Sequence, residues 1–324
     1  MNAETPKATA RLRILFARMA LAAAALTFVV IIASAFMRHT QAGLACADWP
    51  ACYGRMEASG GDTAPSTEVR VARIAHRLAA TSVLAFVIGL LLVAWTQKPA
   101  WKRDGSLALA ALIVAAALAV LGLATPGSRI PAVTLGNLLG GYLMLALLTA
   151  VAAATRANAS EVLPQAQATR LRWSAIVMLA LVFAQAASGA MIGAQYALTA
   201  CPTLDGCPAF SFGELVAAGA LDPFRELSVV DGRVVPPNSA AGLHVIHRAL
   251  GIAIAAAVLA LAYRMRRIDR RATLTLAALA LAAPLLGTLT IITIPSLAFT
   301  VLHNAMVAVL IAILAVTAAR RAAP

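Results

Sequence analysis

The amino-acid sequence predicts an all-α integral membrane protein in which eight transmembrane helices form two tandem, pseudo-symmetric four-helix bundles. Three observations support this fold class: the composition, the length of the apolar runs, and a set of motifs that occurs twice. Of the 324 residues, 61% are hydrophobic and 12% are charged, which is more apolar surface than a water-soluble core of this size can bury. We therefore expect the protein to lie in a lipid bilayer.

Eight apolar runs are long enough, or nearly long enough, to cross a bilayer as helices. A hydrocarbon core of about 30 Å needs about 20 residues of helix. The runs are unbroken, whereas the strands of a membrane β-barrel are shorter and alternate apolar with polar residues. The predicted helices cover residues 19–37, 77–95, 106–125, 132–154, 173–192, 243–263, 272–294 and 296–319.

The first run, at residues 19–37, follows a basic N-terminal segment, as the apolar part of a secretory signal does. It is long enough to span the bilayer, however, and a second span follows it. We expect it to be retained as the first transmembrane helix. The later spans are joined by short connections, except for two long ones at residues 38–75 and 193–242.

The basic residues gather on one side of the predicted membrane. Before the first span, in every second connection and in the C-terminal tail, the chain carries 17 of its 26 lysines and arginines. The other side carries nine of its 13 acidic residues. By the positive-inside rule the basic side is cytoplasmic, which predicts a bacterial inner-membrane protein with both termini inside. The net charge of +13 then follows from topology, and we expect no nucleic-acid partner.

Two pairs of motifs divide the chain into similar halves. The first long connection contains CADWPAC and the second contains CPTLDGC. A span that opens with His-Arg follows each connection, in AHRLAAT and in IHRALGI. We interpret this as an internal duplication, with an N-terminal bundle at residues 1–160 and a C-terminal bundle at residues 161–324. Because four spans return the chain to the same side, both halves have the same orientation.

The four cysteines lie in these two motifs. Cys46 and Cys52 are six positions apart, and so are Cys201 and Cys207. In an oxidising compartment each pair is expected to form a disulfide within its own connection, and the first pair is the better candidate for a redox role. The alternatives are free thiols or a metal site. A metal would need further soft ligands, and only His39, near the first pair, offers one.

Two histidines of the second half lie at matching depth. His247 lies near the outer end of the sixth span and His303 about two turns into the eighth. Both spans run inwards, so at about 1.5 Å per residue the imidazoles reach a similar level. Such a pair in a four-helix bundle can ligate a haem iron from both sides, and Gly251 and Ala255 leave room for a flat ring. Alternatively, each histidine only bonds across helices, and His244 is either a further site residue or a loop cap.

The first half carries only part of this pattern. His76 takes the place of the first histidine of the pair. The halves also share an asparagine, Asn137 and Asn304. When these are aligned, Gly136 falls where His303 stands. A single histidine suits an open iron, or a haem that is held loosely as a substrate, so the two halves are expected to have different roles.

An arginine follows a histidine directly in each half. Arg248 follows His247, and Arg77 follows His76. Each guanidinium is a candidate to pair with haem propionates at the outer surface. The alternative is that both side chains extend toward the lipid headgroups.

Several of these stretches together resemble the haem A synthase family. They are GLACADWPACYGRM, AHRLAAT, PAVTLGNLLGG, IHRALG and VLHNA, and the resemblance runs from about residue 12 to about residue 320. It implies oxidation of the C8 methyl of haem O to the formyl of haem A, for cytochrome oxidase biogenesis. It also implies a haem b whose iron is bound by His247 and His303 in the C-terminal bundle, and a haem O/A site with His76 in the N-terminal bundle.

The chain departs from the family pattern at two places in the first half. Many members have a second histidine where this chain has Gly136 or Asn137. Members also carry a glutamate one turn before the first-half histidine, where this chain has Arg73. The nearest acid upstream is Glu68, which we expect in the connection. His76 and Glu68 are therefore the catalytic candidates that the resemblance implies for this chain.

The predicted function is an oxidoreductase that uses water as the oxygen source. Its expected partners are haem O, delivered by a haem O synthase, an electron acceptor, membrane lipid and a second copy of the chain. One alternative is a haem-binding assembly or transfer protein without turnover. Another is a small-solute transporter, but most spans lack charged residues and the repeats are parallel, which is the less common arrangement in such proteins.

Overall fold

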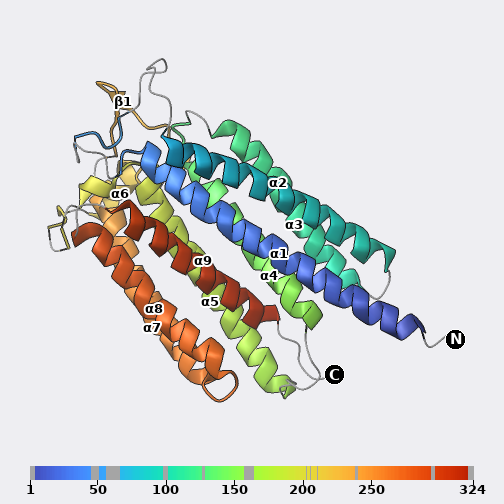
Figure 1. Cartoon of the computed structure of the whole chain (residues 1–324). Coiled ribbons are helices and arrows are strands. Elements are labelled where there is room, and N and C mark those ends of the chain that lie inside the picture. The colour runs from blue at the N-terminus through green and yellow to red at the C-terminus, as the bar shows by residue number, and fades with distance from the viewer. Residues whose placement is uncertain are drawn as a thin grey trace.

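Eight long helices lie side by side in the computed structural model (Figure 1). Within the part of the chain that the structure describes, these eight are long and apolar enough to cross a membrane, so the chain is a multi-pass membrane protein. The structure describes residues 4–44, 51–55, 66–97, 101–125, 128–156, 164–201, 203–204, 206–209, 211–237, 240–292 and 296–319.

All eight predicted spans are confirmed as helices, and several extend well beyond the apolar runs that predicted them. Local signals fix some of the ends: the hydroxyl of Ser66 accepts a hydrogen bond from the N–H of Val69 (3.4 Å) at the start of α2. Pro131 is the first residue of α4, where its missing N–H is not needed. The helices are α1 (Glu4–Gln41), α2 (Thr67–Thr96), α3 (Lys102–Ala124), α4 (Pro131–Arg156), α5 (Gln165–Ala194), α7 (Ala241–Met265), α8 (Arg270–Ile292) and α9 (Leu297–Ala319).

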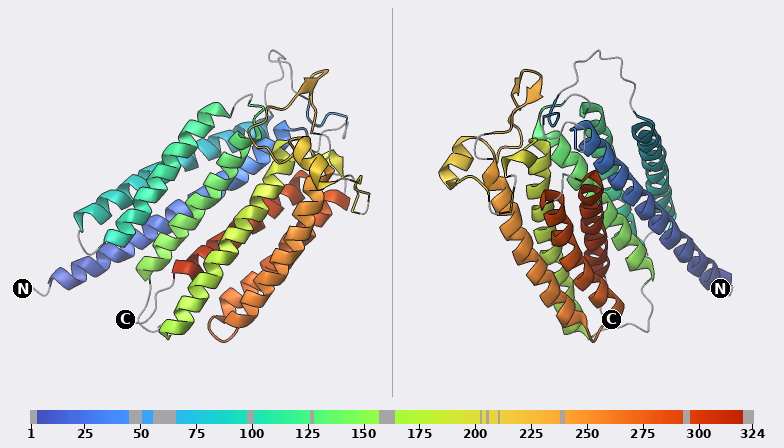
Figure 2. Two further views of the ribbon diagram at one scale, coloured as in Figure 1. Left: turned by 180° about the vertical axis from the view of Figure 1, so that it is seen from behind. Right: turned by 60° about the vertical axis from the view of Figure 1, so that its left-hand side comes forward.

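The long helices form two groups, α1 to α4 and α5 with α7 to α9 (Figure 2). In the first group α1 and α3 each pack against α2 and α4. In the second group α5 and α8 each pack against α7 and α9. The groups meet chiefly along α4 and α9, with further contacts of α1 with α9 and of α4 with α5. The order of neighbours is thus the same in both groups, while the internal duplication stays a prediction.

Apolar side chains fill the interior and also cover the outside. One continuous cluster of buried residues runs through both groups and includes Phe16, Tyr142, Leu148 and Leu314. Large apolar side chains point outwards as well, such as Leu123, which is 86% exposed. A water-soluble protein rarely exposes so much apolar surface. The hydrocarbon of a bilayer covers such faces.

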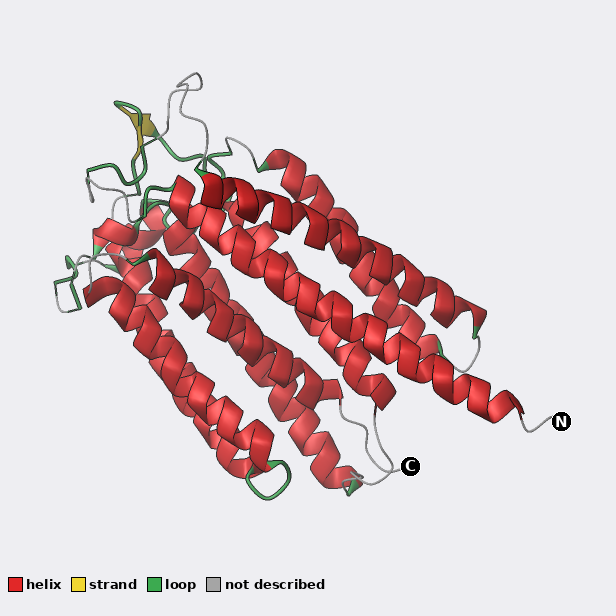
Figure 3. Cartoon of the chain, in the orientation of Figure 1, coloured by secondary structure: helices red, strands yellow, loops and turns green. Residues whose placement is uncertain are grey.

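The second long connection contains short elements that hydropathy does not predict. They are the 3₁₀-helix η2 (Leu198–Ala200), helix α6 (Phe212–Ala217) and the antiparallel strands β1 (Val229–Val230) and β2 (Arg233–Val234). They lie at the end of the molecule opposite to both chain termini (Figure 3). The strands are joined by Asp231 and Gly232, both with positive φ (50° and 72°), as a two-residue hairpin turn requires.

The described part of the first long connection joins this hairpin. The N–H of Val234 donates to the carbonyl of Gly54 (2.9 Å), and Arg55 forms an antiparallel bridge with Arg233. The Arg233 guanidinium also donates to the carbonyl of Tyr53 (3.3 Å). The two connections therefore form one shared structure at the end of the molecule opposite to the termini, and we call these residues, 53–55 with 233–234, the loop junction.

Candidate functional site

The structure brings His247 of α7 and His303 of α9 together. Their ring centres are 6.4 Å apart and their planes make an angle of 71°. Two imidazoles that bind one iron atom from opposite sides have ring centres about 6 Å apart, because each metal–nitrogen bond is about 2 Å long and the ring centre lies about 1 Å beyond the nitrogen. The observed separation therefore fits an iron atom between the two rings.

A hydrogen bond from α9 to α8 orients His303. Its Nδ1 lies 2.8 Å from the carbonyl oxygen of Ala283. A carbonyl only accepts, so Nδ1 carries the proton and Nε2 keeps its lone pair. Histidines that bind metals usually have this arrangement, with one ring nitrogen donating to a carbonyl and the other free to ligate.

Two polar side chains of α5 hold His247. Its Nδ1 lies 2.9 Å from the Ser188 hydroxyl and 3.1 Å from Nε2 of Gln185. The Ser188 hydroxyl donates to the carbonyl of Gln185 (2.8 Å), so its oxygen can accept from Nδ1–H, whereas the amide nitrogen of Gln185 only donates and bonds Nδ1 when Nδ1 carries no proton. With Ser188 as the acceptor, Nε2 of His247 keeps its lone pair, and the Gln185 amide still donates to the backbone carbonyl of His247 (2.9 Å). Sequence reasoning missed Gln185 and Ser188, because an uncharged polar residue within an apolar run gives no specific signal.

Glycines make room around both imidazoles. A Cβ at Gly189 of α5 would lie 2.7 Å from Cε1 of His247, and one at Gly287 of α8 would lie 3.4 Å from Cε1 of His303. A Cβ at Gly251 would lie 2.9 Å from Nε2 of Gln185, whose side-chain oxygen is buried without a partner in the described residues. The site thus combines two imidazoles, close backbone approach and an unused acceptor, which suits a flat, metal-containing ligand such as haem.

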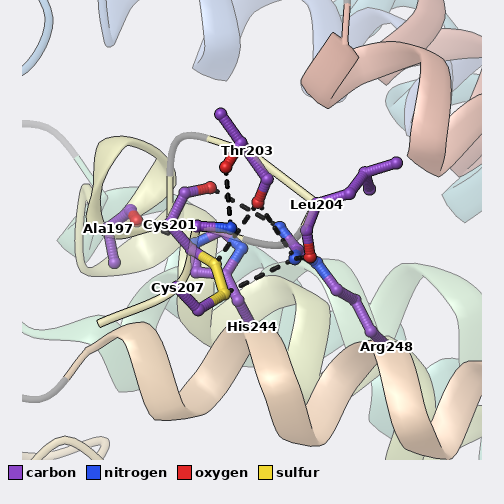
Figure 4. Close-up of a disulfide and its surroundings, with 8 residues drawn as sticks. Ala197, Cys201, Thr203, Leu204, Cys207, His244 and Arg248 are labelled. Atoms are coloured by element: carbon purple, nitrogen blue, oxygen red, sulfur yellow. Dashed lines mark hydrogen bonds between the residues drawn. A yellow bond between two sulfur atoms is a disulfide. The ribbon is translucent and has the colours of Figure 1, made fainter. Parts of the chain in front are cut away.

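The second long connection is fastened to α7 on both sides of His247 (Figure 4). One turn before it, His244 is only 3% exposed, and its Nε2 donates to the carbonyl of Ala197 (2.8 Å). Cys201 and Cys207 form a disulfide within the connection, as predicted. His244 is therefore a loop cap, which is one of the two roles that the sequence allows for it.

The guanidinium of Arg248 binds the same connection. It donates to the carbonyls of Leu204 (2.9 Å), Thr203 (3.2 Å) and Cys201 (3.5 Å), and it contacts Sγ of Cys207 (3.5 Å). These contacts engage both terminal nitrogens of Arg248, while its buried Nε has no partner within the described residues. Arg248 thus fastens the disulfide loop to the helix turn that carries His247.

The structure shows no contact between the first-half candidates among the described residues. His76 is half-buried in α2, no hydrogen bond to its ring is formed within the described residues, and Arg77 is exposed. The position of a Cβ at Gly136 is closest to Leu121 of α3 (2.7 Å), so a leucine fills the space next to this glycine. Asn137 donates to the carbonyl of Val133, as Asn304 does to that of Thr300, which agrees with the alignment of the two asparagines.

The expected position of Glu68 is wrong. It lies in the first turn of α2 and not in the connection, because Ser66 starts the helix there. Glu68 is exposed, and the eight residues to His76 correspond to about 12 Å of helix rise. Arg73 is half-buried one turn before His76. A direct role for the Glu68 carboxylate at His76 therefore has no support in the geometry.

His39 also lies in a helix and not in the first connection. It is in the last turn of α1, and its Cε1 is 3.8 Å from the position of a Cβ at Gly193 of α5. It is within electrostatic range of His303. Cys52 is disulfide-bonded, while Cys46 lies outside the described residues. His39 thus faces the second group of helices.

Polar side chains connect the two groups at this level. The Tyr142 hydroxyl of α4 lies 3.2 Å from the carbonyl oxygen and 3.3 Å from Oδ1 of Asn304, the neighbour of His303. Tyr53 lies in the first connection, where burial raises the pKa of its phenol, and the nearby Tyr196 phenol raises that pKa further. Tyr53 therefore stays protonated and neutral.

Residues 17–315 match the family described as cytochrome oxidase assembly protein. The chain belongs to this family. The cytochrome oxidase assembly match includes all five histidines and all eight membrane-spanning helices in whole or in large part. A relative from Shewanella oneidensis, named heme A synthase, is 26% identical over 253 residues, which cover 74% of this chain and 76% of that protein.

Proposed function

We propose that this protein is a haem A synthase, an oxidoreductase that converts the C8 methyl of haem O into the formyl of haem A. The observation that carries the proposal is the His247–His303 pair, whose ring centres are 6.4 Å apart with both Nδ1 atoms hydrogen-bonded. Membership of a cytochrome oxidase assembly family and the name of the Shewanella relative point to the same haem chemistry.

The second-half site would hold a haem b through His247 and His303. Ala283 accepts from Nδ1 of His303, and Ser188 would accept from Nδ1 of His247, which gives both imidazoles the tautomer that ligates. A haem with two imidazole ligands supplies one-electron transfer. The unpaired oxygen of Gln185 provides an acceptor next to the His247 ring.

The first-half site, with His76, would receive haem O. Conversion of a methyl to a formyl by water removes four protons and four electrons and adds one oxygen atom, so an electron acceptor outside the chain is required. A substrate haem must enter and leave, and a single half-buried imidazole holds it less tightly than a pair would. The basic side of the membrane would be the cytoplasm, with haem O supplied by a haem O synthase in the same membrane.

Haem analysis of the purified protein tests the function. The chain is expressed in cells that make haem O but no haem A, and the extracted haems are separated by chromatography. Wild type should contain haem b and haem A. His76→Ala should retain the haem b spectrum but form no haem A, because it loses only the substrate ligand.

Two results would contradict this proposal. Haem A at the wild-type level in His76→Ala would remove His76 from the reaction. Haem O bound by wild type without any haem A would favour the second candidate, a haem-binding assembly or transfer protein. Cells without haem O are the control, since haem A must then be absent from every variant.

A further inference from the structure

Three arginines at the outer end of the helices differ in what their guanidiniums bind. Both terminal nitrogens of Arg248 donate to carbonyls of the disulfide loop, and Arg77 is exposed. Arg38, in the last turn of α1, is half-buried, and its only hydrogen bond within the described residues is a long one to Nε2 of His39 (3.4 Å). A guanidinium has five N–H donors, so most of those on Arg38 have no acceptor within the part of the chain that the structure describes.

Arg38 lies where the two groups of helices meet. Tyr142 and Tyr53 are both within electrostatic range of its charge. Tyr142 leads directly to the second-half site, because its hydroxyl contacts Asn304, which adjoins His303. Tyr53 is neutral, and no ion pair of Arg38 with an acidic residue is found among the residues that the structure describes.

A half-buried charge inside a membrane protein is costly unless an opposite charge or several hydrogen bonds compensate it. The helix dipole of α1 compensates part of the charge, since Arg38 is in the last turn. That effect is typically below about 1 kcal/mol and satisfies none of the free donors. A carboxylate would compensate the charge and also accept hydrogen bonds from the free donors. Arginine binds a carboxylate through two parallel hydrogen bonds.

We infer that Arg38 binds a haem carboxylate, so that the first group of helices supplies part of the haem-binding surface of the second. The inference rests on the proposed function, which provides two haems with propionate side chains. The link through Tyr142 and Asn304 indicates the haem at His303. The carboxylates of the substrate haem are the other possible source, and the experiment separates the two.

The test compares haem with a haem that has lost its free carboxylates. Purified full-length protein is exchanged with an excess of iron protoporphyrin IX or of its dimethyl ester, and the haem retained after detergent washing is measured. Wild type should prefer the free acid about tenfold or more, because a hydrogen bond to a charged group contributes about 1.5–3 kcal/mol and 1.4 kcal/mol is tenfold. Arg38→Gln should lose this preference.

Matched variants control the comparison. Arg129→Gln removes an arginine of the same outer side that forms an ion pair with Glu226, and it should keep the full preference. Arg38→Lys keeps the charge but cannot form the two parallel hydrogen bonds, so this variant should keep part of the preference for the free acid. If Arg38→Gln does not fold, Arg38→Lys with the two haems decides the question.

The site of the carboxylate follows from the histidine variants. If it belongs to the second-half haem, the preference disappears in His303→Ala and persists in His76→Ala. The reverse result keeps Arg38 as a carboxylate-binding residue and assigns it to the substrate haem. An unchanged preference in Arg38→Gln, or none in wild type that retains haem, overturns the inference alone. Wild type that retains neither haem overturns the proposed function as well.

Discussion

At the scale of single residues, a glycine sets the space around His247. A Cβ at Gly189 would lie 2.7 Å from the ring, which Ser188 and Gln185 hold in place. We expect Gly189→Ala to displace the imidazole, at a cost of about 1–3 kcal/mol for overpacking. The low-spin haem spectrum of the purified, reduced protein should weaken or disappear.

Gly122 of α3 provides the matched control for this substitution. A Cβ there would meet no atom within 4 Å. Gly122→Ala should leave the spectrum unchanged and stabilise the helix by up to about 1 kcal/mol. A Gly189→Ala protein with the wild-type spectrum would show that His247 does not ligate haem in the observed position.

The two histidines themselves give a second prediction. His247→Ala and His303→Ala should each abolish the six-coordinate, low-spin spectrum, because one remaining imidazole leaves the iron with an open position. His244→Ala should keep that spectrum, since within the described residues the His244 ring bonds to the Ala197 carbonyl and to no ligand of the site. Optical and electron paramagnetic resonance spectra measure the spin state. Persistence of the low-spin signal in both single variants would rule out this ligand pair.

The sequence predicts some of these residues and not others. Helix rise places His247 and His303 at one depth, so their proximity follows from hydropathy and counting. The role of Arg248 does not follow, because a cation after the histidine serves a propionate or a loop carbonyl equally well. Only the folded positions of Cys201 and Leu204, whose carbonyls accept from Arg248, decide between them.

At the scale of elements, Arg248 couples the disulfide loop to α7. We expect Arg248→Gln to loosen this loop, because each hydrogen bond of a charged donor contributes about 1.5–3 kcal/mol. The Cys201–Cys207 disulfide should then be reduced about tenfold faster or more by a water-soluble phosphine. Mass spectrometry of alkylated peptides measures the rate. Arg129→Gln is the control, and equal rates in the two variants would show that Arg248 does not restrain the loop.

Helices were predictable and the connections were not. The apolar runs identify all eight spans, because a bilayer requires about 20 apolar residues in each. Several helices were predicted too short, since polar residues such as Arg38 and Glu68 extend a helix beyond the apolar run that hydropathy detects. The short elements of the second connection have local signals that hydropathy does not register, such as the Ser211–Glu214 capping box of α6, and only the bridge from Arg233 to Arg55 depends on the first connection.

At the scale of the whole molecule, the charge distribution predicts the orientation in the membrane. The side with 17 of the 26 basic residues should face the cytoplasm, together with both termini. A single cysteine introduced at Phe224, which is 76% exposed in the second connection, should react in intact cells with a reagent that does not cross the membrane. One at Arg267, between α7 and α8, should react only after lysis. The reverse pattern would invert the topology.

The repeat of motifs predicts two groups of four helices, but it does not predict which helices of the two groups pack against each other. Nothing in the sequence indicates that α4 packs against α9, or that His39 of the first half faces Gly193 of the second. Such contacts join small residues far apart in the chain, and many pairings would satisfy the same hydropathy. The proposed haem sites are therefore assigned to halves by sequence, while the structure shows Tyr142 of one group in contact with Asn304 of the other, next to His303.

The loop junction also has a consequence for how the chain can be divided. Val234 and Arg233 of one half complete backbone pairing with residues 54 and 55 of the other. Two fragments, residues 1–160 and 161–324, made from separate genes would each present an unsatisfied strand edge, and such edges recruit a matching strand. The fragments would thus reassemble as a first half with a second half, which makes this outer surface a natural basis for a split-protein reporter.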